Sequence, residues 1–211
     1  MKCIVANNAW LISLLMMTMM GCVSVDTRTP RIVSTQELDP PLVEEPSIRI
    51  PTHTQSSIWS PHTRSERDWQ AIVIHHSATT SGNAAIFDRW HREQNHWNGV
   101  GYDFVIGNGS ESGDGQVEVT YRWQQQLVGA HCRTPNNWAN EHAIGICLVG
   151  DFSQERPTDA QMKSLVQLVQ FLRQRYSIAR YAVYGHQDTP GARITACPGR
   201  LFPWDELRGA M

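Results

Sequence analysis

The chain has no excess of basic residues, no internal repeat and, beyond its first residues, no long apolar run. Its 211 residues include 18 Lys and Arg against 20 Asp and Glu, a formal net charge of -2. Without a basic stripe, nucleic-acid binding has no electrostatic support. No segment recurs at a fixed period, and no later segment is apolar for long enough to cross a bilayer as a helix. These absences leave one globular domain as the main part of the chain.

The first 22 residues have the pattern of an export signal. A single lysine precedes an apolar run over residues 4–20, and Gly21-Cys22 follows, an arrangement that favours an export signal over a permanent membrane helix. Residues 19–22 resemble the lipobox of bacterial lipoproteins, which implies cleavage before Cys22 and lipidation of Cys22. Val23, in place of an aspartate, then implies the outer membrane, facing the periplasm. An uncleaved anchor and an ordinary secretory signal remain alternatives.

Two further regions follow the signal. Residues 23–65 are rich in proline and threonine and hold no helical or strand period, which predicts an extended tether. Within this stretch, Ile58-Trp59 is an apolar pair that can pack back on the domain. Residues 66–211 have the length and composition of a single folded domain.

Residues 66–211 alternate between strand and helix patterns. Strands are expected at residues 71–76, 101–107, 117–122, 143–150 and 181–186, and helices at residues 83–95 and from Thr158 onward. The segment 143–150 is apolar throughout, as in a central strand buried on both faces. Thr158 and Gln161 fit a capping box at the start of the second helix. The order predicts an α/β single domain with a mixed central β-sheet flanked by helices.

Soft metal ligands stand where two of these strands end. The strand over residues 71–76 finishes in His75-His76, the strand over residues 181–186 finishes in Gly-His, and the following loop returns to Cys197. Imidazole and thiolate ligands suit zinc better than calcium or magnesium, which prefer oxygen. Three protein ligands with an open fourth position are typical of a catalytic zinc, whereas a structural zinc normally has four. The pattern predicts a zinc centre at one edge of the sheet.

Five stretches resemble, in order, the motifs of the zinc-dependent N-acetylmuramoyl-L-alanine amidases of type 2, a group that includes the animal peptidoglycan recognition proteins. They are residues 74–79 (IHHSAT), 101–106 (GYDFVI), 129–131 (GAH), 143–146 (AIGI), and 185–186 with 197–199 (GH and CPG). The resemblance covers residues 69–204. It implies zinc-dependent hydrolysis of the amide bond between the lactyl group of N-acetylmuramic acid and L-alanine. A non-catalytic peptidoglycan-binding module is the alternative.

The resemblance implies three zinc ligands: His75, His186 and Cys197. Strand geometry supports only one ligand from the His75-His76 pair, because adjacent side chains point to opposite faces, so His76 is expected to be packed or hydrogen-bonded. Cys197 has a rival interpretation as half of a disulfide, because an exported protein meets an oxidising compartment. If Cys197 holds zinc, Cys132 and Cys147 can pair or stay free.

The resemblance also assigns roles around the metal. Tyr102 matches a tyrosine beside the zinc-bound water, and Thr195 falls where a hydroxyl can donate a hydrogen bond to the developing oxyanion. His131 and Asn140 match positions on the rim of the substrate groove. Asp103 stands where the motif usually has histidine, at a position expected to face outward.

Four tryptophans are left open as groove walls or as core residues: Trp97, Trp123, Trp138 and Trp204. The expected partners are a peptidoglycan or muropeptide substrate and a membrane, through a lipid anchor at Cys22. No nucleic acid is expected to bind, and a monomer is expected. Whether intact cell wall or released anhydro-muropeptides are cut stays open, as does the purpose of the cut: recycling, division or lysis.

Overall fold

The computed structural model describes residues 57–211. The expected signal peptide, the lipidation of Cys22 and the greater part of the expected tether lie outside the described residues. Within residues 57–211, every helix is too short or too polar to cross a membrane.

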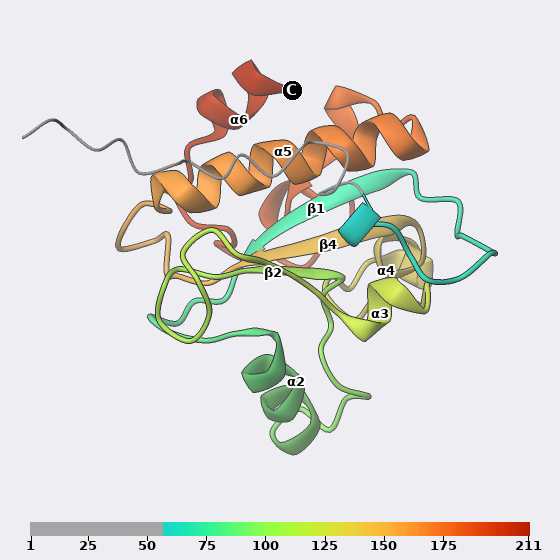
Figure 1. Ribbon diagram of the computed structural model, residues 1–211, viewed down its shortest axis with the longest axis horizontal. Coiled ribbons are helices and arrows are strands. Elements are labelled where there is room, and N and C mark those ends of the chain that lie inside the picture. The colour runs from blue at the N-terminus through green and yellow to red at the C-terminus, as the bar shows by residue number, and fades with distance from the viewer. Residues whose placement is uncertain (1–56) are drawn as a thin grey trace, which may run out of the picture. The chain divides into compact units, whose positions relative to one another are not determined.

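Five strands form one mixed sheet in the order β3-β2-β4-β1-β5 (Figure 1). Their bounds are β1 Ala71–His76, β2 Phe104–Ile106, β3 Val117–Val119, β4 Ala143–Leu148 and β5 Val183–Gly185. β1 lies between β4 and β5 and is parallel to both, β2 is parallel to β4, and β3 alone is antiparallel to its neighbour. The prediction of a mixed central sheet is confirmed. β1 has the predicted bounds, and β4 is buried along its whole length.

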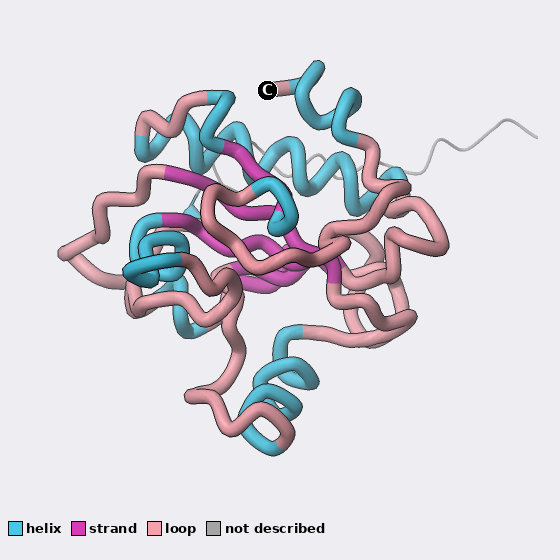
Figure 2. Tube along the Cα trace, turned by 180° about the vertical axis from the view of Figure 1, so that it is seen from behind, coloured by secondary structure: helices cyan, strands magenta, loops and turns pink. Residues whose placement is uncertain are grey.

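Helices and loops enclose this sheet, as Figure 2 shows from behind. The α-helices are α2 Ala84–Glu93, α3 Tyr121–Gln124, α4 Trp138–His142, α5 Asp159–Tyr176 and α6 Trp204–Ala210. Single turns of 3-10 helix occur at η1 Pro135–Asn137, η2 Arg180–Ala182 and η3 His186–Asp188. In Figure 1, α5 lies along one side of the sheet and α2 on the other.

The capping box predicted at the start of α5 is confirmed. The Thr158 hydroxyl accepts the backbone N–H of Gln161 at 3.0 Å, and the Gln161 side-chain oxygen accepts the backbone N–H of Thr158 at 3.2 Å. The same Gln161 amide group donates to the carbonyls of Val149 and Ile106. Gln161 therefore ties the start of the helix to the ends of two strands. The apolar side of α5 packs into the main core through Leu165, Leu168, Val169 and Leu172.

The strand predicted over residues 117–122 ends early. β3 stops at Val119, and the chain turns into the short helix α3 instead. The cause is Arg122, whose guanidinium turns inward and donates to the carbonyls of Val100, at 2.7 Å, and Val128. The antiparallel pairing of residues 104–106 with 117–119 holds as predicted.

Trp59 belongs to the folded domain rather than to a tether. Its side chain is only 5% exposed, and its ring meets the ring of Phe171 on α5 at 5.6 Å. Its carbonyl accepts the indole N–H of Trp123 at 2.8 Å. Ile58, the other member of the apolar pair, remains exposed. The prediction that this pair packs back on the domain therefore holds for Trp59 alone.

Candidate metal centre

The expected metal ligands come from neighbouring strands. His75 is the next-to-last residue of β1. His186 follows directly after β5, which pairs with β1 in parallel. Because parallel strands end at the same edge of a sheet, the two rings meet there, with centroids 4.7 Å apart. The loop after η3 then brings in Cys197, whose carbonyl accepts the backbone N–H of Gln187 at 2.8 Å.

The ligand atoms of His75, His186 and Cys197 all lie within 4.8 Å of one another. Cys197 Sγ is 3.7 Å from His75 Nδ1, and both side chains are buried. Two imidazoles and one thiolate fit a zinc ion that keeps its fourth position for water or substrate. In residues 57–211, no Asp, Glu or further His or Cys joins this group. The residues present therefore fit a catalytic rather than a structural zinc site.

Burial adjusts the protonation of all three ligands. It lowers the pKa of His75 well below the usual range, with help from the neighbouring His131 and His186, and it also lowers the pKa of His186. Both rings are therefore neutral at pH 7 and can offer a lone pair to a metal. Burial raises the pKa of the Cys197 thiol to about 12, although the backbone N–H of His76 opposes this shift. A metal ion must displace the thiol proton, so metal binding releases a proton.

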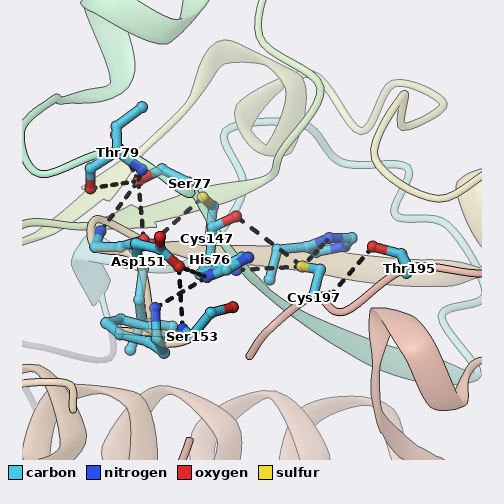
Figure 3. Close-up of polar contacts among 12 residues, drawn as sticks. His76, Ser77, Thr79, Cys147, Asp151, Ser153, Thr195 and Cys197 are labelled. Atoms are coloured by element: carbon cyan, nitrogen blue, oxygen red, sulfur yellow. Dashed lines mark hydrogen bonds and ion pairs between the residues drawn. The ribbon is translucent and has the colours of Figure 1, made fainter. Parts of the chain in front are cut away.

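His76 points away from the metal ligands, as strand alternation predicts. Its Nδ1 accepts the backbone N–H of Phe152 at 3.1 Å and lies 3.7 Å from the Asp151 carboxylate (Figure 3). Its backbone N–H donates to Cys197 Sγ at 3.4 Å. His76 therefore contributes to the site through its backbone, while its ring is held by the loop after β4.

Tyr102 and Thr195 lie beside the three ligands. The Tyr102 ring is 5.3 Å from the His75 ring and packs against the small apolar cluster that contains Cys147. Burial, followed by the nearby thiols, raises the pKa of Tyr102 well above its usual range, so the hydroxyl keeps its proton. The Thr195 oxygen accepts the backbone N–H of Cys197 at 3.2 Å (Figure 3). This bond occupies a lone pair and leaves the Thr195 O–H available as a donor.

His131 and Asn140 are buried and hydrogen-bonded within the protein. His131 Nδ1 is 3.1 Å from His75 Nε2, and His131 Nε2 is 3.1 Å from the Ala143 carbonyl. The Asn140 side-chain oxygen accepts the backbone N–H groups of His131, at 2.8 Å, and Cys132, at 2.9 Å. The substrate contact expected for these two residues stays a prediction.

Asp103 does not face outward, so that prediction was wrong. Its side chain is 0% exposed, and one carboxylate oxygen accepts the backbone N–H of Gly145 at 2.8 Å. The other oxygen has no hydrogen-bond partner in the described protein. Burial raises the pKa of Asp103 to about 7, against the opposing effects of the Gly145 N–H and of Arg122 and Arg67. The inward side chain supplies the acceptor for the backbone N–H of Gly145.

The three cysteines within residues 57–211 form no disulfide. Cys132, Cys147 and Cys197 are all reduced and buried, so the possible Cys132–Cys147 disulfide is not formed. Cys147 lies directly opposite His75 in the β1–β4 pairing. Among the four tryptophans left open, Trp123 is fully buried in the core and Trp97 is exposed.

Sequence reasoning missed the role of His91 in α2. Its Nδ1 accepts the backbone N–H of Gly101 at 3.1 Å, and its ring lies 5.7 Å from the Tyr102 ring. The signal was present, since His91 is four residues after Phe87 and both face the interior of the helix–sheet contact. His91 thus fixes the start of the segment that carries Tyr102.

The fold and the site define a mixed α/β domain with a His-His-Cys group that fits a metal ion. The sequence profile of the N-acetylmuramoyl-L-alanine amidase family Amidase_2 matches residues 65–200, and the chain belongs to this family. Peptidoglycan-recognition protein SC2 of Drosophila melanogaster is 32% identical over 145 residues, which cover 64% of this chain and 71% of that protein.

Solved structures that share the fold and have a quarter or more of the sequence identical include the following two. One is the endolysin N-acetylmuramoyl-L-alanine amidase LysCS from Clostridium intestinale, at 29% identity and a TM-score of 0.55, covering 72% of this chain and 90% of that one. The other is Drosophila PGRP-LB, at 26% identity and a TM-score of 0.50, covering 69% of this chain and 87% of that one. The expected amidase-2 fold is confirmed.

Proposed function

We propose that this protein is a zinc-dependent N-acetylmuramoyl-L-alanine amidase. It hydrolyses the amide bond between the lactyl group of N-acetylmuramic acid and the L-alanine of the stem peptide, in peptidoglycan or in muropeptides. The observation that carries the proposal is the convergence of the His75, His186 and Cys197 ligand atoms within 4.8 Å of one another, with the Tyr102 ring 5.3 Å from the His75 ring. The similarity to a bacterial endolysin amidase supports it.

His75, His186 and Cys197 would hold the zinc ion. When bound, zinc supplies a Lewis acid that polarises the carbonyl and lowers the pKa of a bound water toward neutrality. Water adds to the lactyl carbonyl, the C–N bond breaks, and the nitrogen leaves as the amino group of L-alanine after gaining a proton. No side chain forms a covalent bond to the substrate.

The protein's own contribution is to orient groups around that carbonyl. Tyr102 lies beside His75, and its raised pKa favours the protonated hydroxyl, which can donate a hydrogen bond. The Thr195 hydroxyl is a second donor, since its oxygen already accepts from Cys197. Donors placed where negative charge develops stabilise the transition state, and removing one such donor typically costs about 10²- to 10³-fold in kcat.

The experiment uses the full-length protein with a defined MurNAc-tripeptide, read by mass spectrometry. Activity should disappear with a chelator and return with added zinc. The Cys197→Ser variant should be inactive, whereas Cys132→Ser, the matched control at another buried thiol, should retain activity. Intact substrate under every condition, with zinc bound and the muropeptide retained, would reject the amidase and leave a peptidoglycan-binding module. The similarity to recognition proteins is what favours that second candidate.

We further propose that the chain is exported and anchored by lipid at Cys22, in the outer membrane facing the periplasm, as a monomer. The apolar run over residues 4–20 and the lipobox-like residues 19–22 support this. In a bacterial host, the wild-type protein should fractionate with membranes and incorporate labelled palmitate. The Cys22→Ala variant should incorporate none, and palmitate labelling of that variant would contradict lipidation at Cys22.

A further inference from the structure

His131 lies outside the three ligands, but it touches one of them. Its Nε2 is 3.1 Å from the Ala143 carbonyl oxygen, and its Nδ1 is 3.1 Å from His75 Nε2. A carbonyl oxygen can only accept a hydrogen bond, so His131 Nε2 must carry a proton and donate it. In a neutral imidazole, the other nitrogen then has a lone pair and no proton. His131 Nδ1 is therefore an acceptor.

The same reasoning determines the protonation of His75. Because His131 Nδ1 accepts, His75 Nε2 must be the donor across their 3.1 Å contact. The lone pair of neutral His75 is then on Nδ1, the nitrogen that lies 3.7 Å from Cys197 Sγ. The free lone pair of His75 thus faces the other metal ligands. One backbone carbonyl, acting through two rings, specifies which nitrogen of His75 is available to the metal.

The space around His131 is built for an imidazole ring. A Cβ atom at Gly145, in the middle of β4, would lie 2.5 Å from His131 Cδ2, and one at Gly129 would lie 2.7 Å from the same atom. Both positions therefore need glycine for the ring to fit, as glycine inside a strand often indicates a close approach. The Asn140 side-chain oxygen accepts the backbone N–H of His131. The two glycines therefore leave room for the ring, and Asn140 fixes the backbone that carries it.

We propose that His131 is a positioning residue that, by relaying the Ala143 hydrogen bond to His75 Nε2, holds His75 with Nδ1 directed at the metal. The inference rests on the metal binding in the proposed function, but it concerns metal affinity and proton positions, which are measured without substrate. A protein that lacks amidase activity can still confirm it.

The first test measures zinc affinity by competition with a chromophoric chelator. Removing the hydrogen-bond partner of a metal-ligating histidine typically weakens metal binding about 10- to 100-fold. We expect this loss in His131→Phe, which fills the space without an acceptor. His131→Asn, whose side-chain oxygen can replace Nδ1 as acceptor, should recover most of the affinity. His142→Phe, at a partly exposed histidine away from the ligands, is the matched control.

The second test needs no substitution. Long-range proton–nitrogen NMR correlations of the metal-free wild-type protein should show His75 and His131 each protonated on Nε2 alone, with the His75 ring proton protected from exchange with water. Protonation of His131 on Nδ1 would overturn the proposal, even if the variants fail to fold. A folded His131→Phe variant that binds zinc within twofold of wild type would also overturn it.

Discussion

The buried carboxyl of Asp103 predicts an unusual pH dependence of stability. Its pKa is about 7 in the folded protein, because burial favours the uncharged form, and about 3.9 in an unfolded chain. The folded state therefore holds this proton more tightly than the unfolded state does. The resulting stabilisation is complete below the unfolded pKa and is lost as the pH rises through 7. The loss is about 1.3 kcal/mol between pH 5 and pH 6, levels off near the folded pKa, and totals about 3 kcal/mol by pH 8.

The Asp103→Asn variant removes this titration while keeping an oxygen that can accept the Gly145 N–H. We expect the wild-type protein to lose about 3 kcal/mol of unfolding free energy relative to Asp103→Asn between pH 5 and pH 8. The buried histidines are neutral in the fold, so their contribution to the unfolding free energy changes with pH in the opposite direction. Wild type and Asp103→Asn share these histidines, so their contribution cancels when the two unfolding free energies are subtracted. Urea denaturation at each pH, followed by tryptophan fluorescence with chelator present throughout, measures the two free energies.

Asp68→Asn is the matched control, because it removes an exposed carboxylate from the same domain. The same denaturation series on Asp68→Asn gives the pH dependence that removal of a surface carboxylate produces by itself. If the difference in unfolding free energy between wild type and Asp103→Asn is constant within about 0.5 kcal/mol from pH 5 to pH 8, Asp103 is ionised in the folded protein at pH 5. That result would refute the reasoning from its burial.

Three further substitutions have expected outcomes. Tyr102→Phe should lower kcat by about 10²-fold or more, with zinc stoichiometry unchanged. An unchanged kcat would show that the Tyr102 hydroxyl does not stabilise the transition state. Thr158→Ala should lower the unfolding free energy by about 1 kcal/mol through loss of the capping box, with no change in zinc affinity, as read by urea denaturation and chelator competition. Gly145→Ala should lower the unfolding free energy by about 1 to 3 kcal/mol, because the new Cβ clashes with the His131 ring, and it should also weaken zinc binding. Normal zinc affinity in Gly145→Ala would show that the ring can shift without consequence.

Local patterns predicted the parts of the site that depend on single strands. Strand alternation allowed only one metal ligand from the His75-His76 pair, the family resemblance chose His75, and the structure turns these two rings to opposite faces. The apolar run at residues 143–150 correctly predicted a central strand, because burial on both faces leaves a continuous pattern. The Thr158 capping box is equally local, since both of its hydrogen bonds span three residues.

Features that depend on distant partners could not be predicted in this way. Asp103 turns inward to the N–H of Gly145, which is 42 positions later, and no local pattern contains that information. Arg122 interrupts the expected strand because its guanidinium reaches the carbonyl of Val100, 22 positions earlier. The contact between His131 and His75 spans 56 positions. In each case a polar side chain finds a backbone or ring partner that only the folded sheet supplies.

The order of the strands also determines when during folding the metal centre can form. β1 carries His75 and comes first in the chain, but both of its neighbours in the sheet are synthesised later, and Cys197 follows His75 by 122 positions. Pairing such distant segments requires the closure of long loops, which slows folding. A nascent chain that ends before residue 197 lacks one of the three ligands. Tight zinc uptake should therefore report the last stage of folding and not an early intermediate.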